Sequence, residues 1–304
     1  MTIEIPMISI IMNCYNGDRF LKEAIDSVYA QTFAKWEIVF WDNASTDKSS
    51  QIANSYDQRL KYFCADKTKP LGEARNLAIQ KAKGKYICFL DCDDLYLENK
   101  LEKQLELMEE NEYAMSYGST IVIDENGDKK RNEPVSYKSG YLFDRLLTRY
   151  EINMLSVMIR RSVLEDNKLS FLPHLQYCPD HNLFMEIASQ FPVGVLPDYL
   201  VEYRVVAGSL SRKTLHLVST EIQYTLDRVL MRDPEIRDKY PRQVKTAYAK
   251  LNYYDAINYI SKSMYTDARR CLKNVVTERW QYLMLYILLF FPFSSSTLLR
   301  LLKR

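Results

Sequence analysis

The first 110 residues alternate between two hydrophobic patterns, and this alternation constrains the fold more than any other feature. Short continuous apolar runs, as expected for strands buried on both faces, alternate with segments whose apolar residues recur at helical spacing. The runs predict strands at 7–12, 36–41, 60–64 and 86–90, and the other segments predict helices at 20–29, 47–56, 73–82 and 99–111. This order predicts an α/β fold with a doubly wound, mostly parallel sheet. Gly84 directly after a predicted helix indicates its end.

The pattern becomes less regular after residue 111 and wholly helical after about residue 214. The middle of the chain predicts strands at 113–124, 155–159 and 199–205, a turn at 125–128 and a helix at 180–190. The last third predicts helices at 214–231, 241–261 and 264–277. We therefore expect a first domain over 1–212, a helical C-terminal region over 213–279 and a separate tail over 280–304.

The tail has an apolar run at 282–293, interrupted by Pro292 and followed by Arg300, Lys303 and Arg304 with no acid among them. Twelve apolar residues are fewer than the roughly 18–20 that a membrane-spanning helix needs. One interpretation is a helix packed on the body of the protein. We favour the other, an amphipathic helix lying on the cytoplasmic membrane face with its basic residues toward anionic headgroups.

Composition excludes several classes of partner and site. The net charge of +2 gives no support to a nucleic-acid partner. Only eight glycines are present, and neither GxGxxG nor GxxxxGK[ST] occurs. The six cysteines form no CxxC pair, so we expect reduced thiols in a cytosolic protein, without a disulfide framework or a zinc site. The N-terminal residues lack the features of a signal peptide.

Acidic residues follow the strand predicted at 86–90. Asp91, Asp93 and Asp94 lie within four positions, and carboxylates this close repel one another unless a cation neutralises them. Carboxylates together with substrate phosphates are the ligands that Mg²⁺ and Mn²⁺ prefer. The alternative is a solvated turn, with Asp94 capping the next helix.

Polar residues also follow the first two predicted strands, at 13–16 and 42–43. In a doubly wound sheet the ligand crevice lies beyond the carboxyl ends of the strands. The sequence therefore predicts that three loops bring polar groups to one rim.

Four stretches of the chain, in order, resemble glycosyltransferase family 2, whose enzymes have the GT-A fold and use nucleotide-sugars. The stretches are ISIIMNCYNGDRFLKEAIDSVYAQTFAKWEIVFWDNASTDKS (8–49), LGEARNLAIQKAKGKYICFLDCDD (71–94), PDHNLFMEIA (179–188) and YRVVAGSLS (203–211). The resemblance covers about the first 210 residues. It implies a Rossmann-like GT-A domain followed by a helical region.

The resemblance also implies how the donor is held. Tyr15 would pack on the nucleotide base, Asp42 would bind the base edge, and Arg75 would lie near the base and diphosphate. Asp91-Cys92-Asp93 would be the DxD motif that holds Mn²⁺ or Mg²⁺. Asp93 is expected to be the direct ligand, with Asp91 nearer the ribose or a metal-bound water.

Asp180 matches the carboxylate that serves as catalytic base in the family. Each assignment has a structural alternative: Tyr15 as a packing residue, Asp42 as a turn former, Arg75 as a surface residue and Asp180 as a helix cap. The chain departs from its relatives at Pro179, where many have Glu, and at Val206, where many have His. Without that histidine a third protein ligand to the metal is not expected.

Together these features predict an inverting, metal-dependent glycosyltransferase that moves a sugar from a UDP- or dTDP-linked donor to a glycan or lipid-linked glycan. It would act in the cytoplasm, peripherally on the inner face of the cell membrane, and a homo-oligomer is one option for its assembly. The alternative function is a nucleotide-sugar-binding subunit of a polysaccharide synthase complex without turnover. An interaction scaffold built on the helices at 241–277 is compatible with either.

Overall fold

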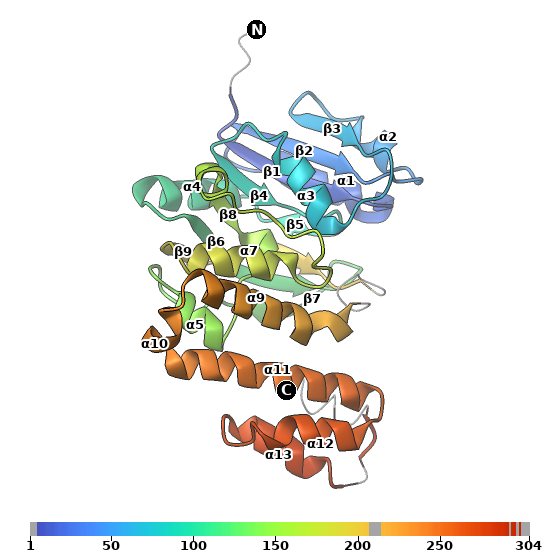
Figure 1. Ribbon diagram of the computed structural model, residues 1–304. Helices are drawn as coiled ribbons and strands as arrows, with labels where there is room; N and C mark the ends of the chain where they lie inside the picture. Colours follow the sequence, from blue (N-terminus) through green and yellow to red (C-terminus); the bar gives the residue numbers. More distant parts are fainter. Residues whose placement is uncertain (1–4, 207–213, 292, 296–297, 299–304) are drawn as a thin grey trace. The chain divides into compact units, whose positions relative to one another are not determined.

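The computed structural model describes residues 5–206, 214–291, 293–295 and 298 (Figure 1). The chain forms two compact units. Unit 1 comprises Met1–Phe143 and Glu151–Ala207, and unit 2 comprises Asp144–Tyr150 and Gly208–Arg304. The predicted domain boundary at 212 lies outside the described residues.

Unit 1 is built on a mixed sheet with the strand order β3-β2-β1-β4-β8-β6-β9-β5, with β7 paired to β6. The first four strands are mutually parallel, whereas β8 runs antiparallel to both β4 and β6. The strands are β1 (Ile8–Cys14), β2 (Trp36–Asp42), β3 (Leu60–Cys64), β4 (Tyr86–Phe89), β5 (Leu95–Tyr96), β6 (Met115–Ile123), β7 (Lys129–Glu133), β8 (Met158–Arg160) and β9 (Val193–Arg204). The predicted α/β class with a doubly wound, mixed sheet is confirmed.

Helices cover both faces of this sheet because the side chains of each central strand are buried on both sides. On one face Ile10 and Met12 of β1 share a core with Leu21 and Ile25 of α1. On the other face Phe89 of β4 contacts Phe171 edge to face, with ring centroids 5.5 Å apart, and Phe184 of α7 at 6.4 Å. The helices of unit 1 are α1 (Asp18–Tyr29), α2 (Ser49–Ala53), α3 (Leu71–Ile79), α4 (Lys100–Glu110), α6 (Arg161–Asp166) and α7 (Pro179–Ala188).

Three expectations about these elements were wrong in detail. The helix expected at 47–56 is reduced to five residues in α2. The strand expected at 155–159 is a 3₁₀ turn, η1 (Met154–Ser156), followed by β8. Gly84 does not cap a helix, since α3 ends at Ile79; an added Cβ at Gly84 would lie 2.5 Å from the main-chain nitrogen of Ser9. Close approach of two backbones explains this glycine.

Unit 2 is helical throughout its described part. Its elements are α5 (Phe143–Thr148), which begins at the last residue of a unit 1 segment, η2 (Leu215–Leu217), α9 (Val218–Arg232), α10 (Ile236–Lys239), α11 (Pro241–Ser261), α12 (Tyr265–Lys273) and α13 (Trp280–Leu288). Buried residues of α11, α12 and α13, among them Ala256, Leu272 and Leu285, form one hydrophobic core. None of the described helices combines the length and apolar character that crossing a membrane requires.

Helix α13 has one side packed in the core and apolar residues exposed on the other. Tyr282, Leu285 and Leu289 are buried in the core of unit 2. The exposed apolar residues on its other side and directly after it are Trp280, Leu283, Met284, Ile287, Phe290 and Phe291. The basic residues Arg300, Lys303 and Arg304, on which the membrane interpretation also depends, lie outside the described residues.

Candidate active site

Three parallel strands of unit 1 deliver their loops to one edge of the sheet. Cys14 at the end of β1 is in register with Asp42 at the end of β2, and Ile11 is in register with Phe89 at the end of β4. The main-chain N–H of Asn43 donates to the carbonyl of Cys14 at 2.8 Å. The loops after β1, β2 and β4 therefore start side by side.

The loops after β1 and β2 are locked together by side-chain-to-backbone hydrogen bonds. The N–H of Asn16 donates to Ser45 Oγ at 3.0 Å, and the N–H of Thr46 donates to Asn16 Oδ1 at 2.8 Å. Asn16 and Ala44 both adopt left-handed backbone conformations, with φ of 52° and 64°. Such a conformation costs a residue with a Cβ about 1 kcal/mol or more, so these bonds hold strained backbone beside the candidate site.

Asp42 is buried between these loops and β3, with 1% of its surface exposed. Its Oδ1 accepts the N–H of Ser45 at 2.7 Å, and its Oδ2 accepts the hydroxyl of Tyr62 at 2.7 Å. The turn-forming role is therefore real. A carboxylate has about four acceptor positions, so two bonds leave capacity for a ligand donor.

Tyr15 lies in the loop after β1 with 57% of its surface exposed. Its side chain makes no hydrogen bond or ring contact with another described residue. The packing alternative is therefore wrong, because an exposed ring adds nothing to the core. Exposure leaves the ring face accessible to a ligand.

Arg75 comes from α3 and meets Asp91 in the loop after β4. Arg75 Nη2 lies 3.3 Å from Asp91 Oδ1. Arg75 is 5% exposed, and its guanidinium lies over the ring of Phe171, with Arg75 Cζ 5.4 Å from the ring centroid. Arg75 is therefore not a surface residue. It is a fixed cation at the sheet edge, and Asp91, with 39% of its side chain exposed, is its acidic neighbour.

Asp180 lies in the first turn of α7, and the charges of Arg75 and Asp91 act on it. Burial raises its pKa, the positive charge of Arg75 lowers it and the negative charge of Asp91 raises it further. The backbone N–H groups of Asp180 and His181 oppose the rise. Arg75, Asp91 and Asp180 thus act on one another although they lie far apart in the sequence.

Asp93 also lies close to other negative charge, and its pKa is raised. Its pKa is raised to about 6, first by burial and then by Asp91, while Arg204 opposes the rise. Two carboxylates held close together repel each other, and a divalent ion bound to both offsets that repulsion. Two hard oxygen donors at one turn fit Mg²⁺ or Mn²⁺, with Asp93 and Asp91 as the residues that would hold the ion.

The described residues contain no group of three His, Cys, Asp or Glu side chains able to hold a metal. Two buried donors at the same edge, Asn13 Nδ2 and Trp41 Nε1, find no hydrogen-bond acceptor within the described residues. They belong to paired positions of β1 and β2. Unpaired buried donors fit a site completed by a polar ligand.

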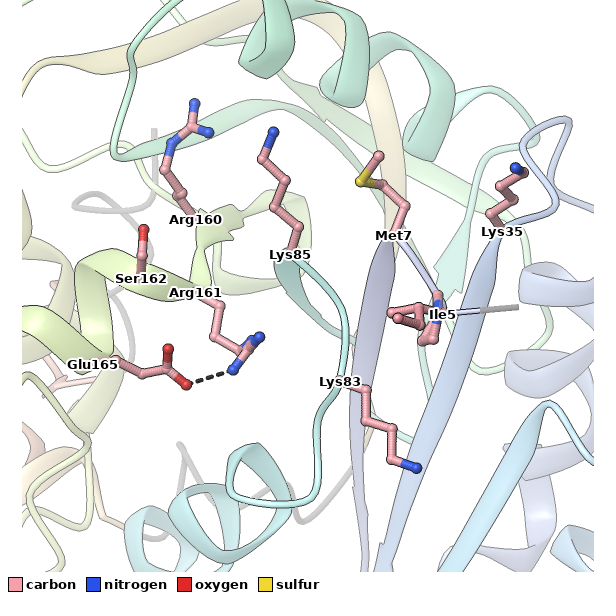
Figure 2. Close-up of a pocket in the computed structure, with 10 residues that line it drawn as sticks. Ile5, Met7, Lys35, Lys83, Lys85, Arg160, Arg161, Ser162 and Glu165 are labelled. Atoms are coloured by element: carbon pink, nitrogen blue, oxygen red, sulfur yellow. Dashed lines mark hydrogen bonds and ion pairs between the residues drawn. The ribbon is translucent and has the colours of Figure 1, made fainter. Parts of the chain in front are cut away.

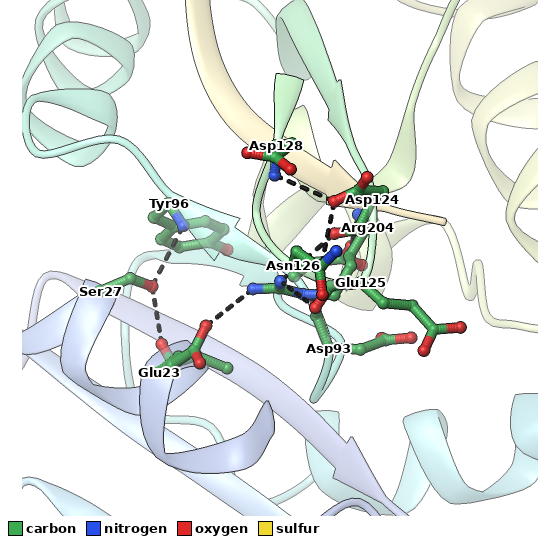
Figure 3. Close-up of polar contacts among 11 residues, drawn as sticks. Glu23, Ser27, Asp93, Tyr96, Asp124, Glu125, Asn126, Asp128 and Arg204 are labelled. Carbon is green, nitrogen blue, oxygen red and sulfur yellow. Dashed lines mark hydrogen bonds and ion pairs between the residues drawn. The ribbon is translucent and has the colours of Figure 1, made fainter. Parts of the chain in front are cut away.

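Arg204, at the end of β9, is a positioning residue that sequence reasoning missed. Its Nε donates to the carbonyl of Asp93 at 2.8 Å, and its Nη1 reaches the carbonyls of Asp124 and Glu125 at 3.4 Å (Figure 3). Its Nη2 pairs with Glu23 Oε2 of α1 at 2.8 Å. The YR pair that opens the stretch at 203–211 was the available signal.

Asp94 does not cap the following helix, as the alternative interpretation had proposed. It is 1% exposed, and its Oδ1 accepts the main-chain N–H of Arg204 at 2.6 Å. Burial, then Asp93 and Asp91, raise its pKa well above the usual range. Asp94 therefore fastens the acidic turn to β9.

Comparison with known proteins identifies the family of this chain. The family model described as "Glycosyl transferase family 2" matches residues 9–166. An uncharacterized glycosyltransferase of Haemophilus influenzae is 32% identical over 212 residues, which are 69% of this chain and 82% of that protein. An Escherichia coli relative, UDP-Glc:alpha-D-GlcNAc-diphosphoundecaprenol beta-1,3-glucosyltransferase WfgD, is 29% identical over 67% of this chain and 79% of its own. A longer relative from Rickettsia felis matches over 33% of its length.

Solved structures show the same fold at low sequence identity. The structure of Staphylococcus aureus TarS in complex with UDP-GlcNAc has a TM-score of 0.59 and 17% identity, covering 89% of this chain and 88% of that one. The mannosyltransferase PcManGT from Pyrobaculum calidifontis, in complex with GDP-Man and Mn²⁺, has a TM-score of 0.60 and 16% identity, covering 90% and 76%. These likenesses confirm the GT-A fold that the sequence resemblance implied.

Proposed function

The chain belongs to glycosyltransferase family 2, and from this we propose that it is an inverting enzyme that moves a sugar from a nucleoside-diphosphate sugar to a hydroxyl group. The observation that carries the proposal is the convergence of Arg75, Asp91 and Asp180 in one electrostatic environment at the carboxyl edge of the sheet. A non-catalytic subunit would have no need of a half-buried acid with a raised pKa beside the donor site.

The donor nucleotide would lie across the loops after β1 and β2. Asp42 would accept the imide N–H of uracil or thymine, the exposed ring of Tyr15 would stack on the base, and Arg75 would bind the diphosphate. The unpaired donors Asn13 Nδ2 and Trp41 Nε1 support a polar ligand at this edge. The name of the E. coli relative, which specifies UDP-Glc, supports a UDP-linked donor.

Asp93 and Asp91 would hold Mn²⁺ or Mg²⁺ on the diphosphate. When bound, the ion would offset the negative charge that grows on the leaving diphosphate as the glycosidic bond breaks. The carboxylate pair and the raised pKa of Asp93 support this assignment. The same-fold mannosyltransferase complex contains Mn²⁺.

Asp180 would act as the base. The acceptor oxygen attacks the anomeric carbon opposite the diphosphate, its proton passes to Asp180, and the electron pair of the breaking C–O bond leaves on the diphosphate. Attack from that face inverts the anomeric configuration. The raised pKa of Asp180 makes it a stronger base than an ordinary aspartate.

The test is transfer by Asp180→Asn against the matched control Asp166→Asn, an exposed acid of α6. We expect the first variant to lose about 10²–10⁴-fold in kcat because one positioned base supplies that factor. It should still bind the nucleotide with Mn²⁺, because Asp42, Asp91 and Asp93 are intact. Turnover like that of the control would exclude Asp180 as the base. A thermal-shift panel of nucleotide-sugars, with and without Mn²⁺, would identify the donor, since ligand binding to the folded state raises stability.

We also propose a lipid-linked glycan acceptor at the inner face of the cell membrane, with unit 2 lying on the lipid surface. The exposed apolar side of α13 supports this, because Leu283, Ile287 and Phe290 are each at least 44% exposed. The acceptor named for the E. coli relative is a diphosphoundecaprenol-linked sugar.

Deleting 280–304 would also remove core residues of unit 2, so point variants give a sharper test. Leu283→Gln, Ile287→Gln and Phe290→Gln combined should reduce sedimentation with phosphatidylglycerol vesicles without changing the thermal unfolding temperature. The control is Met231→Gln in α9, where a single exposed apolar residue is replaced. Undiminished sedimentation of the triple variant would contradict the membrane role of α13.

A further inference from the structure

A second hollow lies at the opposite edge of the sheet of unit 1, at the amino ends of β1, β2 and β4 (Figure 2). Its volume is about 520 Å³. Ligands of doubly wound sheets bind at the carboxyl ends of the strands, so this position is not that of the donor site. The seven residues of β1 alone separate the two edges by roughly 20 Å.

Five basic residues from three chain segments line the hollow. Lys35 precedes β2, Lys83 and Lys85 precede β4, and Arg160 and Arg161 lie where β8 passes into α6. Glu165 is the single acid of the lining. Because the segments lie far apart in the sequence, this concentration of charge is produced by the fold and is invisible in the net charge of the chain.

The positive charge of this cluster is only partly neutralised. Arg161 pairs with Glu165 at 2.5 Å, and Lys85 pairs with Glu109 at 2.6 Å. The ammonium of Lys83 makes no hydrogen bond or ion pair with another described residue. Arg160 likewise makes no ion pair with a described carboxylate, so Lys83 and Arg160 give the hollow a positive potential that favours an anion.

Two of the cations are held in place by neutral partners. Arg160 Nη1 donates to the hydroxyl of Tyr86 at 3.0 Å, and its Nη2 donates to the carbonyl of Met108 at 2.8 Å. Arg161 Nε donates to the carbonyl of Gly84 at 2.7 Å. Fixed guanidinium groups beside lysine ammonium groups are a combination with which proteins bind phosphate groups.

We propose that this hollow binds a phosphate group, either on the headgroup of an anionic phospholipid or in a free phosphate or diphosphate. The two sources share the same chemistry, a compact oxyanion between ammonium and guanidinium groups. Ile5, which lies at the hollow and is 77% exposed, provides an apolar contact beside the charges. This site is independent of the function proposed for the carboxyl edge.

The test uses the full chain and the double variant Lys83→Gln/Lys85→Gln. Both lysines are exposed. The main-chain N–H of Lys83 donates to Glu37 Oε1 at 2.8 Å, and this hydrogen bond does not depend on the lysine side chain. The matched control is Lys61→Gln/Lys129→Gln, which removes the same charge from exposed lysines elsewhere in unit 1. All proteins are compared in EDTA, so that a metal-dependent donor site does not contribute.

Calorimetry with inorganic pyrophosphate measures the soluble source, and sedimentation with phosphatidylglycerol vesicles, against phosphatidylcholine vesicles, measures the lipid source. We expect about a fivefold loss of affinity for each lysine replaced, in at least one of these assays, and little change in the control. Loss with pyrophosphate assigns a soluble ligand, and loss with vesicles alone assigns a headgroup. Equal binding by the double variant and the control in both assays, or no binding by the wild type, would overturn the proposal.

Discussion

The main-chain N–H of Arg204 donates to Asp94 Oδ1 at 2.6 Å, so the end of β9 is joined directly to the acidic turn after β4. The side chain of Arg204 then reaches back to the carbonyl of Asp93 and across to Glu23 (Figure 3). Arg204, which lies 110 positions after Asp94 in the sequence, therefore stabilises the turn that contains the proposed metal ligands. This relationship explains how closely spaced carboxylates keep one arrangement in spite of their repulsion.

Arg204→Lys should loosen this turn. A lysine cannot bond several separated acceptors at once, so buried carbonyls lose their donor, at a cost of about 2–3 kcal/mol in the free energy of unfolding. Calorimetric binding of UDP with Mn²⁺ should weaken as well. Arg131→Lys, at an exposed arginine of β7, is the control. An equal, small effect of both changes would mean that Arg204 does not position the turn.

Gly17→Ala should disturb the same turn from the other side. A Cβ at residue 17 would lie 2.9 Å from Cys92 Cβ and 3.0 Å from Cys14 Sγ, closer than packed atoms tolerate. We expect a loss of about 1–3 kcal/mol in stability and weaker Mn²⁺-dependent nucleotide binding, because Cys92 separates Asp91 from Asp93. Gly127→Asn is the control: nothing lies within 4 Å there, and Asn tolerates the φ of 86°. Unchanged melting and binding by Gly17→Ala would contradict this packing account.

Sequence patterns were sufficient where burial decides the structure. The strand predicted at 60–64 has those bounds in the structure, and the loops after β1, β2 and β4 meet at one edge because parallel strands require it. By contrast, β7 was missed because its residues, Lys129–Glu133, are all exposed and polar. It is a strand only because its backbone pairs with β6, and such pairing leaves no hydrophobic pattern.

Polar contacts between residues far apart in the sequence could not be predicted either. The resemblance suggested Arg75, Asp91 and Asp180 one by one, but their mutual influence on pKa depends on the fold. Arg204 bonds mainly to backbone carbonyls, which every residue has, so no sequence spacing points to its partners. The basic hollow could not be predicted either, because its lysines and arginines come from separate chain segments and the net charge of the chain is near zero.

Tyr62→Phe should weaken binding of the donor nucleotide while Asp42 stays in place. The hydroxyl of Tyr62 orients the Asp42 carboxylate at 2.7 Å, and one lost hydrogen bond is worth about 1 kcal/mol, or roughly fivefold in the Kd for UDP. Tyr56→Phe is a matched control, because it removes an equally short tyrosine bond to an acid, Asp26 of α1, away from the carboxyl edge. Titration calorimetry should separate the two. A Kd unaltered by Tyr62→Phe would argue against base recognition by Asp42.

Asp57→Asn should reduce stability at neutral pH and lose its effect in acid. The Arg59 guanidinium, 2.9 Å away, is the main cause that lowers the pKa of Asp57 to about 2. Because the folded pKa lies below the unfolded value of 3.8, the stabilisation is complete above pH 4 and disappears as the pH falls toward 2. Both side chains are more than a third exposed, so the loss at pH 7 should be only about 0.5–1 kcal/mol. Urea unfolding at pH 7, 4 and 2.5 should show the difference from wild type narrowing, whereas Asp66→Asn, at an exposed acid without an ion pair among the described residues, should show little difference at any pH.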